Sequence, residues 1–309
     1  MQSVYEACTS GEPPGRRGTT QGGRMAEFDI VIAGGTVVTA ADTFVADIGI
    51  RGERIAAVAE DLAGQAKTVI DATGKLVMPG GIDSHVHISQ PSGEGIVMAD
   101  DFESGTLSAL FGGNTTIMPF CLQERGDSLR GAIDAYHKLA EGECYTDVSF
   151  HLIVSDPTDE VLGQELPAAI EAGYSSIKVF MTYENLRLND AELLATFDVA
   201  RRHKATMMIH CENEDAIRYL VQKHEAAGDV RPLAHATTRP IPVEREATHR
   251  AVSLAEVVDI PIVIVHVSNG ASAEEIRRAR ARGRTVTAET LPAIPRADGE
   301  GPRRDGLGG

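Results

Sequence analysis

The chain has no tryptophan and only four cysteines in 309 residues, Cys8, Cys121, Cys144 and Cys211. None of the four stands in a C-x-x-C pair, which excludes a zinc-finger spacing and gives no basis for a disulfide framework. Reduced thiols are typical of the cytoplasm, so we expect a cytoplasmic protein. Aromatic packing is left to phenylalanine and tyrosine.

Long apolar runs and an excess of basic residues are also absent. No stretch approaches the roughly 20 apolar residues that a membrane-spanning helix needs. Asp and Glu number 45 against 29 Lys and Arg, and the net charge is −16. Because such a chain is repelled by phosphate backbones and anionic lipid surfaces, we expect neither nucleic acid nor a membrane as a partner.

Residues 1–24 are rich in Gly, Pro and Arg and lack the apolar core of a signal peptide. We expect this leader to be disordered or foreign to the fold. A strand-like segment follows Met25 at once, which suggests Met25 as the true start of translation. An intact mass from the native host that retained residues 1–24 would contradict this hypothesis.

The pattern of the remaining chain changes at residue 76. Residues 25–75 form a small β module in which Gly-Gly and Arg-Gly-Glu turns predict antiparallel hairpins over 27–38 and 44–59, with a further strand over 66–71. Beyond it, short apolar strands alternate with helical stretches. The expected strands cover 76–88, 114–121, 147–154, 175–183, 206–213, 261–268 and 284–290. The expected helical stretches cover 99–113, 128–141, 165–174, 189–204, 242–258 and 272–283.

This alternation indicates an α/β fold with a parallel sheet. The leading candidate for residues 76–290 is a (β/α)8 TIM-type barrel that lacks its last strand, because such barrels gather active-site residues at the carboxyl ends of several strands. A doubly wound sheet is the alternative. It more often carries a Gly-rich phosphate loop after its first strand, and this chain has none.

Two histidines close the first of these strands, within VMPGGIDSHVHI at 77–88. His85 and His87 are two residues apart, so on a strand their side chains point to the same face. Paired imidazoles suit zinc, iron or nickel. A single His-x-His is nevertheless more often a pair of hydrogen-bonded polar residues than a metal site.

Three further polar residues end later strands. Lys178 lies within the run IKVF, His210 follows MMI, and His266 follows IV. Each alone has an ordinary explanation, such as a hydrogen-bonded core histidine or a lysine that reaches solvent. Burying all of them at one end of a barrel without a shared partner would be costly, which favours a common ligand. His151, inside the third strand, is given no metal role.

At this point the sequence resembles the amidohydrolase superfamily, in its branch of D-hydantoinases and dihydropyrimidinases. The resemblance covers roughly 25–290, and it depends on several motifs together. These motifs are GGIDSHVH at 80–87, ADDF at 99–102, SIKVFMTY at 176–183, HCEN at 210–213 and HVS at 266–268.

The resemblance implies a site with two divalent metal ions, for which zinc is expected. His85 and His87 would bind the more buried ion, and His210 and His266 the second. Lys178 would be carboxylated by CO2 to N6-carboxylysine and bridge both ions. The modification is needed because an ammonium group has no lone pair, whereas a carbamate offers two oxygens. A buried lysine with a depressed pKa can react with CO2 through its neutral amine.

The implied activity is hydrolysis of the cyclic amide C–N bond of hydantoins or dihydropyrimidines by a hydroxide that two metals activate. Tyr183 would help to hold the substrate and its developing oxyanion. The implied partners are a small cyclic amide substrate and further copies of the chain in a homotetramer or homodimer. In the family, an Asp at the end of strand eight moves the proton.

This chain shows no eighth strand. After Thr290 the pattern gives way to residues 291–309, which we expect to form an aberrant disordered tail, so no catalytic Asp is assigned. The β-sandwich of the small module is expected to be incomplete for the same reason. Codons for Leu291 to Arg296 can be chosen so that reading one nucleotide later gives Cys-Pro-Gln-Tyr-Leu, a segment usual in the family. This suggests a frameshift, which the gene sequence would test. Open barrel edges would lower solubility, and hydrolysis would be impaired.

Other functions stay open. Allantoinase and dihydroorotase are related cyclic amidases. Dihydroorotase usually has an arginine soon after His-x-His, where this chain has Ile88-Ser89-Gln90. A non-catalytic, dihydropyrimidinase-related interaction protein would be expected to lose metal ligands, whereas all five remain here. About two zinc equivalents per chain would favour the enzyme, and none would favour the interaction protein.

Overall fold

The computed structural model describes residues 26–92 and 95–291. The chain divides into two compact units, of which the smaller combines Met1–Ile82 with Leu107–Thr116 and the larger combines Asp83–Thr106 with Ile117–Gly309. The predictions for the leader (1–24) and for all but the first residue of the tail (291–309) lie outside the described residues. No described helix is both long and apolar enough to cross a bilayer.

The smaller unit is built on one five-stranded sheet with the order β3-β2-β1-β4, in which β5 also pairs with β1. The antiparallel β2–β3 pairing confirms the hairpin expected over 44–59. The hairpin expected over 27–38 is wrong, because β1 continues through Gly34 and Gly35 as one strand that pairs antiparallel with β2. Strands β4 and β5 run parallel to β1. That this unit is an incomplete β-sandwich stays a prediction. The strands are β1 Phe28–Val38, β2 Thr43–Arg51, β3 Arg54–Ala59, β4 Ala66–Asp71 and β5 Leu76–Val77, with a short 3-10 helix η1 at Ala63–Gln65.

A buried carboxylate organises this small sheet. Strand β1 carries an irregularity between Ile32 and Gly35, and Gly34 there has a φ of +72°, which glycine adopts readily. Asp47 on β2 accepts hydrogen bonds from the backbone N–H of Gly34 at 2.8 Å and of Leu62 at 3.0 Å. Asp47 therefore pairs the backbone amide of Gly34, which lies in the irregular part of β1, and the backbone amide of Leu62.

The larger unit contains a sheet in which the strands follow one another in chain order, β6-β7-β9-β10-β11-β12-β13. The pairings β7–β9, β9–β10, β10–β11, β11–β12 and β12–β13 are parallel, and β8 pairs with β7 outside this order. Strands are found at all seven predicted positions, but two of the predicted strands are split. The first (76–88) contains β5 and β6, which belong to different sheets, and the third (147–154) contains two short strands. The strands are β6 Gly81–Val86, β7 Asn114–Leu122, β8 Asp147–Val148, β9 His151–Ile153, β10 Ser176–Phe180, β11 Thr206–His210, β12 Ile262–Ile264 and β13 Val286–Ala288.

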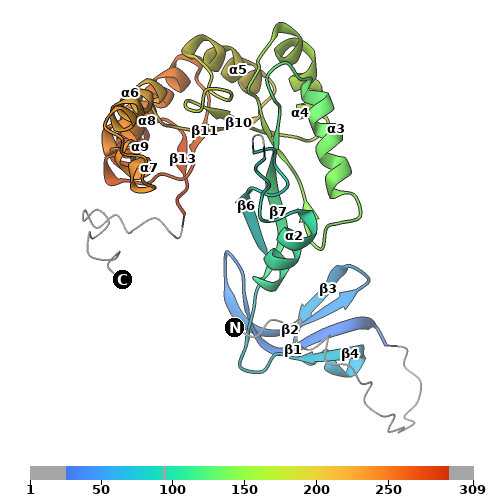
Figure 1. The fold of residues 1–309 in the computed structure, drawn as a ribbon. Coiled ribbons are helices and arrows are strands. Elements are labelled where there is room, and N and C mark those ends of the chain that lie inside the picture. The colour runs from blue at the N-terminus through green and yellow to red at the C-terminus, as the bar shows by residue number, and fades with distance from the viewer. Residues whose placement is uncertain (1–25, 93–94, 292–309) are drawn as a thin grey trace. The chain divides into compact units, whose positions relative to one another are not determined.

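Helices connect these strands and lie along the outer side of the larger unit's sheet (Figure 1). The six predicted helical stretches are confirmed as α2, α3, α4, α5, α8 and α9, while α6 and α7 were not predicted. Their bounds are α2 Phe102–Phe111, α3 Leu129–Ala140, a π-helical turn η2 Val161–Glu165, α4 Leu166–Glu171, α5 Asp190–Arg202, α6 Glu214–Ala226, α7 Leu233–Thr237, α8 Ile241–Val258 and α9 Gly270–Ala281.

The sheet of the larger unit is curled. Its terminal strands β6 and β13 are not neighbours in the pairing order, yet His85 of β6 contacts Glu289, which follows β13 directly. If the sheet were flat, the seven strands in this pairing order would hold β6 and β13 far apart, since neighbouring strands are about 4.8 Å apart. The parallel order and the curl agree with a TIM-type α/β barrel.

Alternation along the strands places an apolar cluster on the inner face of this curl. In β10, Ile177 and Val179 are buried on the side opposite Lys178 and Phe180. Phe180 belongs to a buried cluster to which five strands or their ends contribute. The cluster consists of Phe120, Ile153, Phe180, Met208 and Val265. Polar residues at the strand ends pack on this cluster: the rings of His85 and His87 contact Phe120, and the ring of His210 contacts Phe180.

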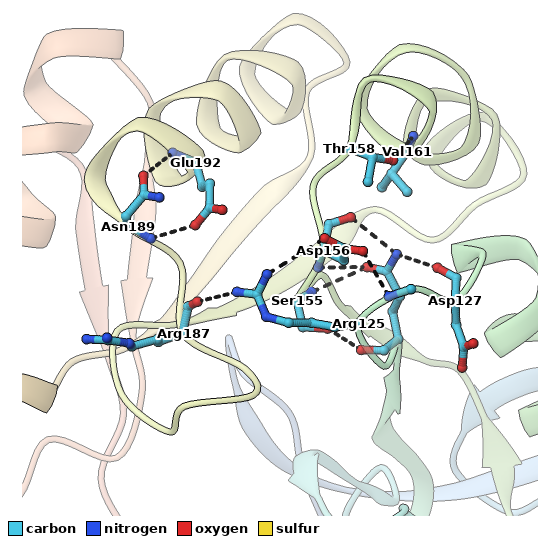
Figure 2. A network of polar contacts seen from close by, with 11 residues as sticks. Arg125, Asp127, Ser155, Asp156, Thr158, Val161, Arg187, Asn189 and Glu192 are labelled. Carbon is cyan, nitrogen blue, oxygen red and sulfur yellow. Dashed lines mark hydrogen bonds and ion pairs between the residues drawn. The ribbon is translucent and has the colours of Figure 1, made fainter.

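Polar contacts tie together the loops that follow β7, β9 and β10 (Figure 2). The Arg125 guanidinium donates to the carbonyl oxygen of Arg187 at 2.7 Å and lies 3.7 Å from the Asp156 carboxylate. Asp156 also accepts from the Gly126 backbone N–H at 2.9 Å. These contacts restrain the loop that leads away from β10.

Candidate active site

Two of the predicted metal ligands lie at the carboxyl end of β6. The ring centroids of His85 and His87 are 5.3 Å apart, and both rings pack on Phe120 at 4.7 and 4.8 Å. His85 Nδ1 contacts Glu289, and His87 Nδ1 lies 2.7 Å from the Gln90 side-chain oxygen. Burial is the main cause that lowers the pKa of His87. The prediction that both imidazoles share one face is confirmed.

Lys178 is buried in the middle of β10, with 1% of its surface exposed. Its Nζ lies 5.0 Å from the ring centroids of both Phe120 and Phe180. Burial lowers its pKa to about 7, against the opposing effect of the Glu289 charge. Because the ordinary value is 10.5, a large fraction of this amine is neutral near pH 7.

His210 ends β11, and its ring centroid lies 4.5 Å from that of His266, which follows β12. The His266 ring is in turn 5.6 Å from the His85 ring, so the histidines of strands one, five and six converge. Burial is the main cause that lowers the pKa of His210 to about 3 and that of His266 to about 2. Both imidazoles are therefore neutral at pH 7.

An ion pair supports His210 from one side. Its Nε2 lies 2.8 Å from Glu212 Oε2, and Glu212 Oε1 lies 3.3 Å from Arg239 Nε. Burial raises the pKa of Glu212, an effect that Arg239 opposes. Since Nε2 is the ring nitrogen that meets the carboxylate, Nδ1 remains the nitrogen with a lone pair to offer.

Tyr183 lies in the loop after β10 with 39% of its surface exposed, and its ring centroid is 5.2 Å from that of His210. Its backbone φ of +69° is in the left-handed region. Burial of the phenol and the nearby Glu212 charge raise its pKa, so the hydroxyl stays protonated at neutral pH. Tyr183 borders a cavity of about 490 Å³, whose lining also includes His87, Lys178, His210, Arg239 and His266.

The side chains suit a metal chemically, but they are not arranged as a finished ligand cluster. Across residues 26–92 and 95–291, no group of three or more His, Cys, Asp or Glu side chains is placed to hold a metal ion. The set includes neutral imidazoles, which are the ligating form of histidine, and a buried lysine whose lowered pKa reduces the fraction of the non-ligating ammonium form. The donor chemistry therefore fits divalent metals.

The sequence interpretation missed the carboxylates around these residues. Glu289 follows β13 and contacts His85, and burial raises its pKa while the His85 contact brings the pKa below its ordinary value. Its place at a strand end is the same signal that pointed to His210. Glu212 and Glu214 also went unremarked. His151 is a hydrogen-bonded core residue, since Nδ1 meets Ser176 Oγ at 2.5 Å and Nε2 meets the Ser84 carbonyl at 2.9 Å.

Comparison with known proteins places these observations in a family context. Residues 76–231 match the sequence pattern of the amidohydrolase family. The chain is 45% identical over 264 residues to a D-hydantoinase of Geobacillus stearothermophilus, covering 85% of this chain and 56% of the relative. It is 35% identical over 276 residues to a dihydropyrimidinase of Rattus norvegicus, covering 87% and 53%.

The chain is also similar to solved structures of D-hydantoinases. A D-hydantoinase from Bacillus sp. AR9 superposes with a TM-score of 0.84 at 43% identity, covering 87% of this chain and 59% of that one. The structure of another D-hydantoinase gives a TM-score of 0.83 at 43% identity, covering 85% and 57%. The chain thus spans little more than half the length of the relatives that it matches.

Proposed function

Since the chain belongs to the amidohydrolase family, we propose that its site serves the hydrolysis of a cyclic amide C–N bond in hydantoins or dihydropyrimidines. One observation carries the proposal. A buried lysine, a tyrosine and the histidines His87, His210 and His266 line one cavity. The His85 ring lies 5.3 Å from the His87 ring and 5.6 Å from the His266 ring. The names of the relatives, D-hydantoinase and dihydropyrimidinase, support this substrate class.

We propose that His85, His87, His210, His266 and the carbamate of Lys178 hold two divalent metal ions, with zinc as the expected metal. The low pKa values of His210 and His266 support this assignment, because ligation needs the neutral imidazole. When bound, such metals polarise a carbonyl and lower the pKa of a water so that it becomes a nucleophile.

The buried position of Lys178 supports its carboxylation. With a pKa of about 7, its amine has a free lone pair at neutral pH. Nζ forms a bond to the carbon of CO2, one C=O π bond breaks, and the nitrogen loses a proton to solvent. The product is an anionic carbamate, which replaces a cation that would repel metals with a group that attracts them.

Tyr183 is proposed to donate its phenolic hydrogen to the substrate oxygen on which negative charge develops. Its raised pKa keeps that hydrogen in place at neutral pH, and its contact with His210 places it beside the proposed ligands. A cavity of about 490 Å³ is in the size range of small-molecule sites. Among the described residues we assign no proton-transferring aspartate.

The experiment measures release of the N-carbamoyl product from dihydrouracil and from a 5-substituted hydantoin. The chain is compared after chelation and after reloading with zinc and bicarbonate. We expect product release only in the reloaded sample, and a lower rate for Tyr183→Phe. Equal rates with and without metal would contradict the proposal. The expected homodimer or homotetramer stays a separate prediction, which sedimentation would test.

A further inference from the structure

Glu214 is a buried carboxylate, 8% exposed, to which the mechanism above gives no task. It is the first residue of α6, and it lies beneath the loop that carries Tyr183. We propose that Glu214 is a positioning residue that fixes the Tyr183 loop and thereby aims the phenol at the cavity. The inference rests on the role proposed for Tyr183.

One oxygen of Glu214 makes both of the contacts that matter. Oε2 accepts a hydrogen bond from the Thr182 hydroxyl at 2.7 Å and another from the Tyr183 backbone N–H at 3.0 Å. Thr182 is fully buried, so the first of these bonds is closed off from water. Two consecutive residues of the loop are therefore attached to a single carboxylate.

The backbone of Tyr183 needs such an attachment. Its φ of +69° is unfavourable for a residue with a Cβ, and such conformations persist only when the surroundings enforce them. The Tyr183 carbonyl accepts from the N–H groups of Leu186 and Arg187, both at 2.8 Å. These bonds close the turn on its carboxyl side, and Glu214 supplies the partner for the remaining N–H.

The far end of the same loop is restrained separately. Arg125 donates to the carbonyl oxygen of Arg187 at 2.7 Å, as Figure 2 shows, and the Leu188 N–H donates to the Phe180 carbonyl at 2.9 Å. The loop after β10 is thus anchored at its exit by other groups. Loss of the Glu214 contacts would free the segment around Thr182 and Tyr183 without releasing the rest of the loop.

The chemistry of the contact makes a graded series of variants possible. In Glu214→Gln, the amide oxygen can accept the same two hydrogen bonds. In Glu214→Asp, the chain is one methylene shorter and the carboxylate does not reach. Glu214→Ala has no acceptor. Glu192→Ala is the matched control, because Glu192 also accepts a backbone N–H in the first turn of a helix, from Asn189 at 2.8 Å.

The experiment is fluorine NMR of the full chain labelled with 3-fluorotyrosine, which reports its six tyrosines separately and needs no turnover. Tyr183→Phe identifies the Tyr183 resonance by its loss. In Glu214→Ala and Glu214→Asp we expect this resonance to move to its position in the urea-unfolded protein. In Glu214→Gln and Glu192→Ala it should keep its wild-type shift.

The inference is overturned if the Tyr183 resonance keeps its wild-type shift in Glu214→Ala, or if Glu214→Gln moves it as far as Glu214→Ala does. Should Glu214→Ala move every tyrosine resonance, the Asp and Gln variants decide the matter by the same criterion. Absence of metal-dependent turnover in the wild type would count against the proposed function, whereas the fluorine shifts alone decide the role of Glu214.

Discussion

His85 Nδ1 and Glu289 Oε1 are in direct contact although 204 positions separate the two residues in the chain. The contact joins the end of the first strand of the parallel sheet to the end of the last one described. A carboxylate on the outer nitrogen of a ligating imidazole fixes its tautomer and raises its basicity. His85 then presents Nε2, with its lone pair, to the proposed metals.

Replacement of Glu289 tests this relationship. We expect Glu289→Ala to weaken zinc affinity by about 10- to 100-fold, while Glu289→Gln has a smaller effect because its amide oxygen can still accept from Nδ1. Competition with a chromophoric chelator measures the affinity. Glu275→Ala is the control, since Glu275 makes a similar contact to His249 Nδ1 at 3.0 Å outside the cavity. Equal affinities for Glu289→Ala and Glu275→Ala would contradict the prediction.

Carboxylation of Lys178 should depend on pH. Its pKa is lowered to about 7, mainly by burial, so the neutral amine that reacts with CO2 becomes the major form as pH rises through that value. At a fixed CO2 pressure, the carbamate signal in ¹³C NMR should therefore grow between about pH 6 and about pH 8. Lys178→Arg should show no such signal. A signal that stays constant over this range would show that the amine is not the limiting group.

Asn189 is expected to stabilise α5 as its N-cap. Its side-chain oxygen accepts a hydrogen bond from the Glu192 backbone N–H at 3.0 Å. In turn, the Asn189 backbone N–H donates to the Glu192 carboxylate at 2.8 Å. Asn189→Ala should lower the free energy of unfolding by about 1 kcal/mol in urea titrations. Asn189→Asp keeps an acceptor and should remain near the wild type. Equal losses in both variants would contradict the capping role.

Cys121 should be inert in the folded protein. Its side chain is fully buried, and burial raises its pKa to about 12, so almost no thiolate exists at pH 8. Among Cys121, Cys144 and Cys211, alkylation should reach the partly exposed Cys144 first and Cys121 only on unfolding. Peptide mass mapping over time measures this order. Labelling of Cys121 at the rate of Cys144 would show that the strand opens readily.

The positions of β11 and β12 could be predicted from sequence because each is a short apolar run with a histidine at or just after its end. His210 and His266 stand out for this reason, and their convergence with His85 is found in the structure. Helix α6 was missed although Asn213 caps it and acidic residues fill its first turn, because the preceding motif was interpreted only for its chemistry.

The supporting carboxylates could not be assigned in the same way. In an acidic chain, Glu212, Glu214 and Glu289 are indistinguishable in type from surface glutamates. Their roles arise from contacts to His210, Tyr183 and His85 that only the folded sheet creates. The contact between Glu289 and His85 depends on the curl of the whole sheet, which no local pattern encodes.

The most direct measurement of the central claim is the metal content of the full chain. After loading with zinc in the presence of bicarbonate and removal of excess metal, mass spectrometry should find about two zinc equivalents per chain. His266→Ala and Lys178→Ala should each bind fewer, and His249→Ala, which lies outside the cavity, should match the wild type. A wild-type chain without zinc, or one whose zinc content is unchanged in His266→Ala and Lys178→Ala, would contradict the account.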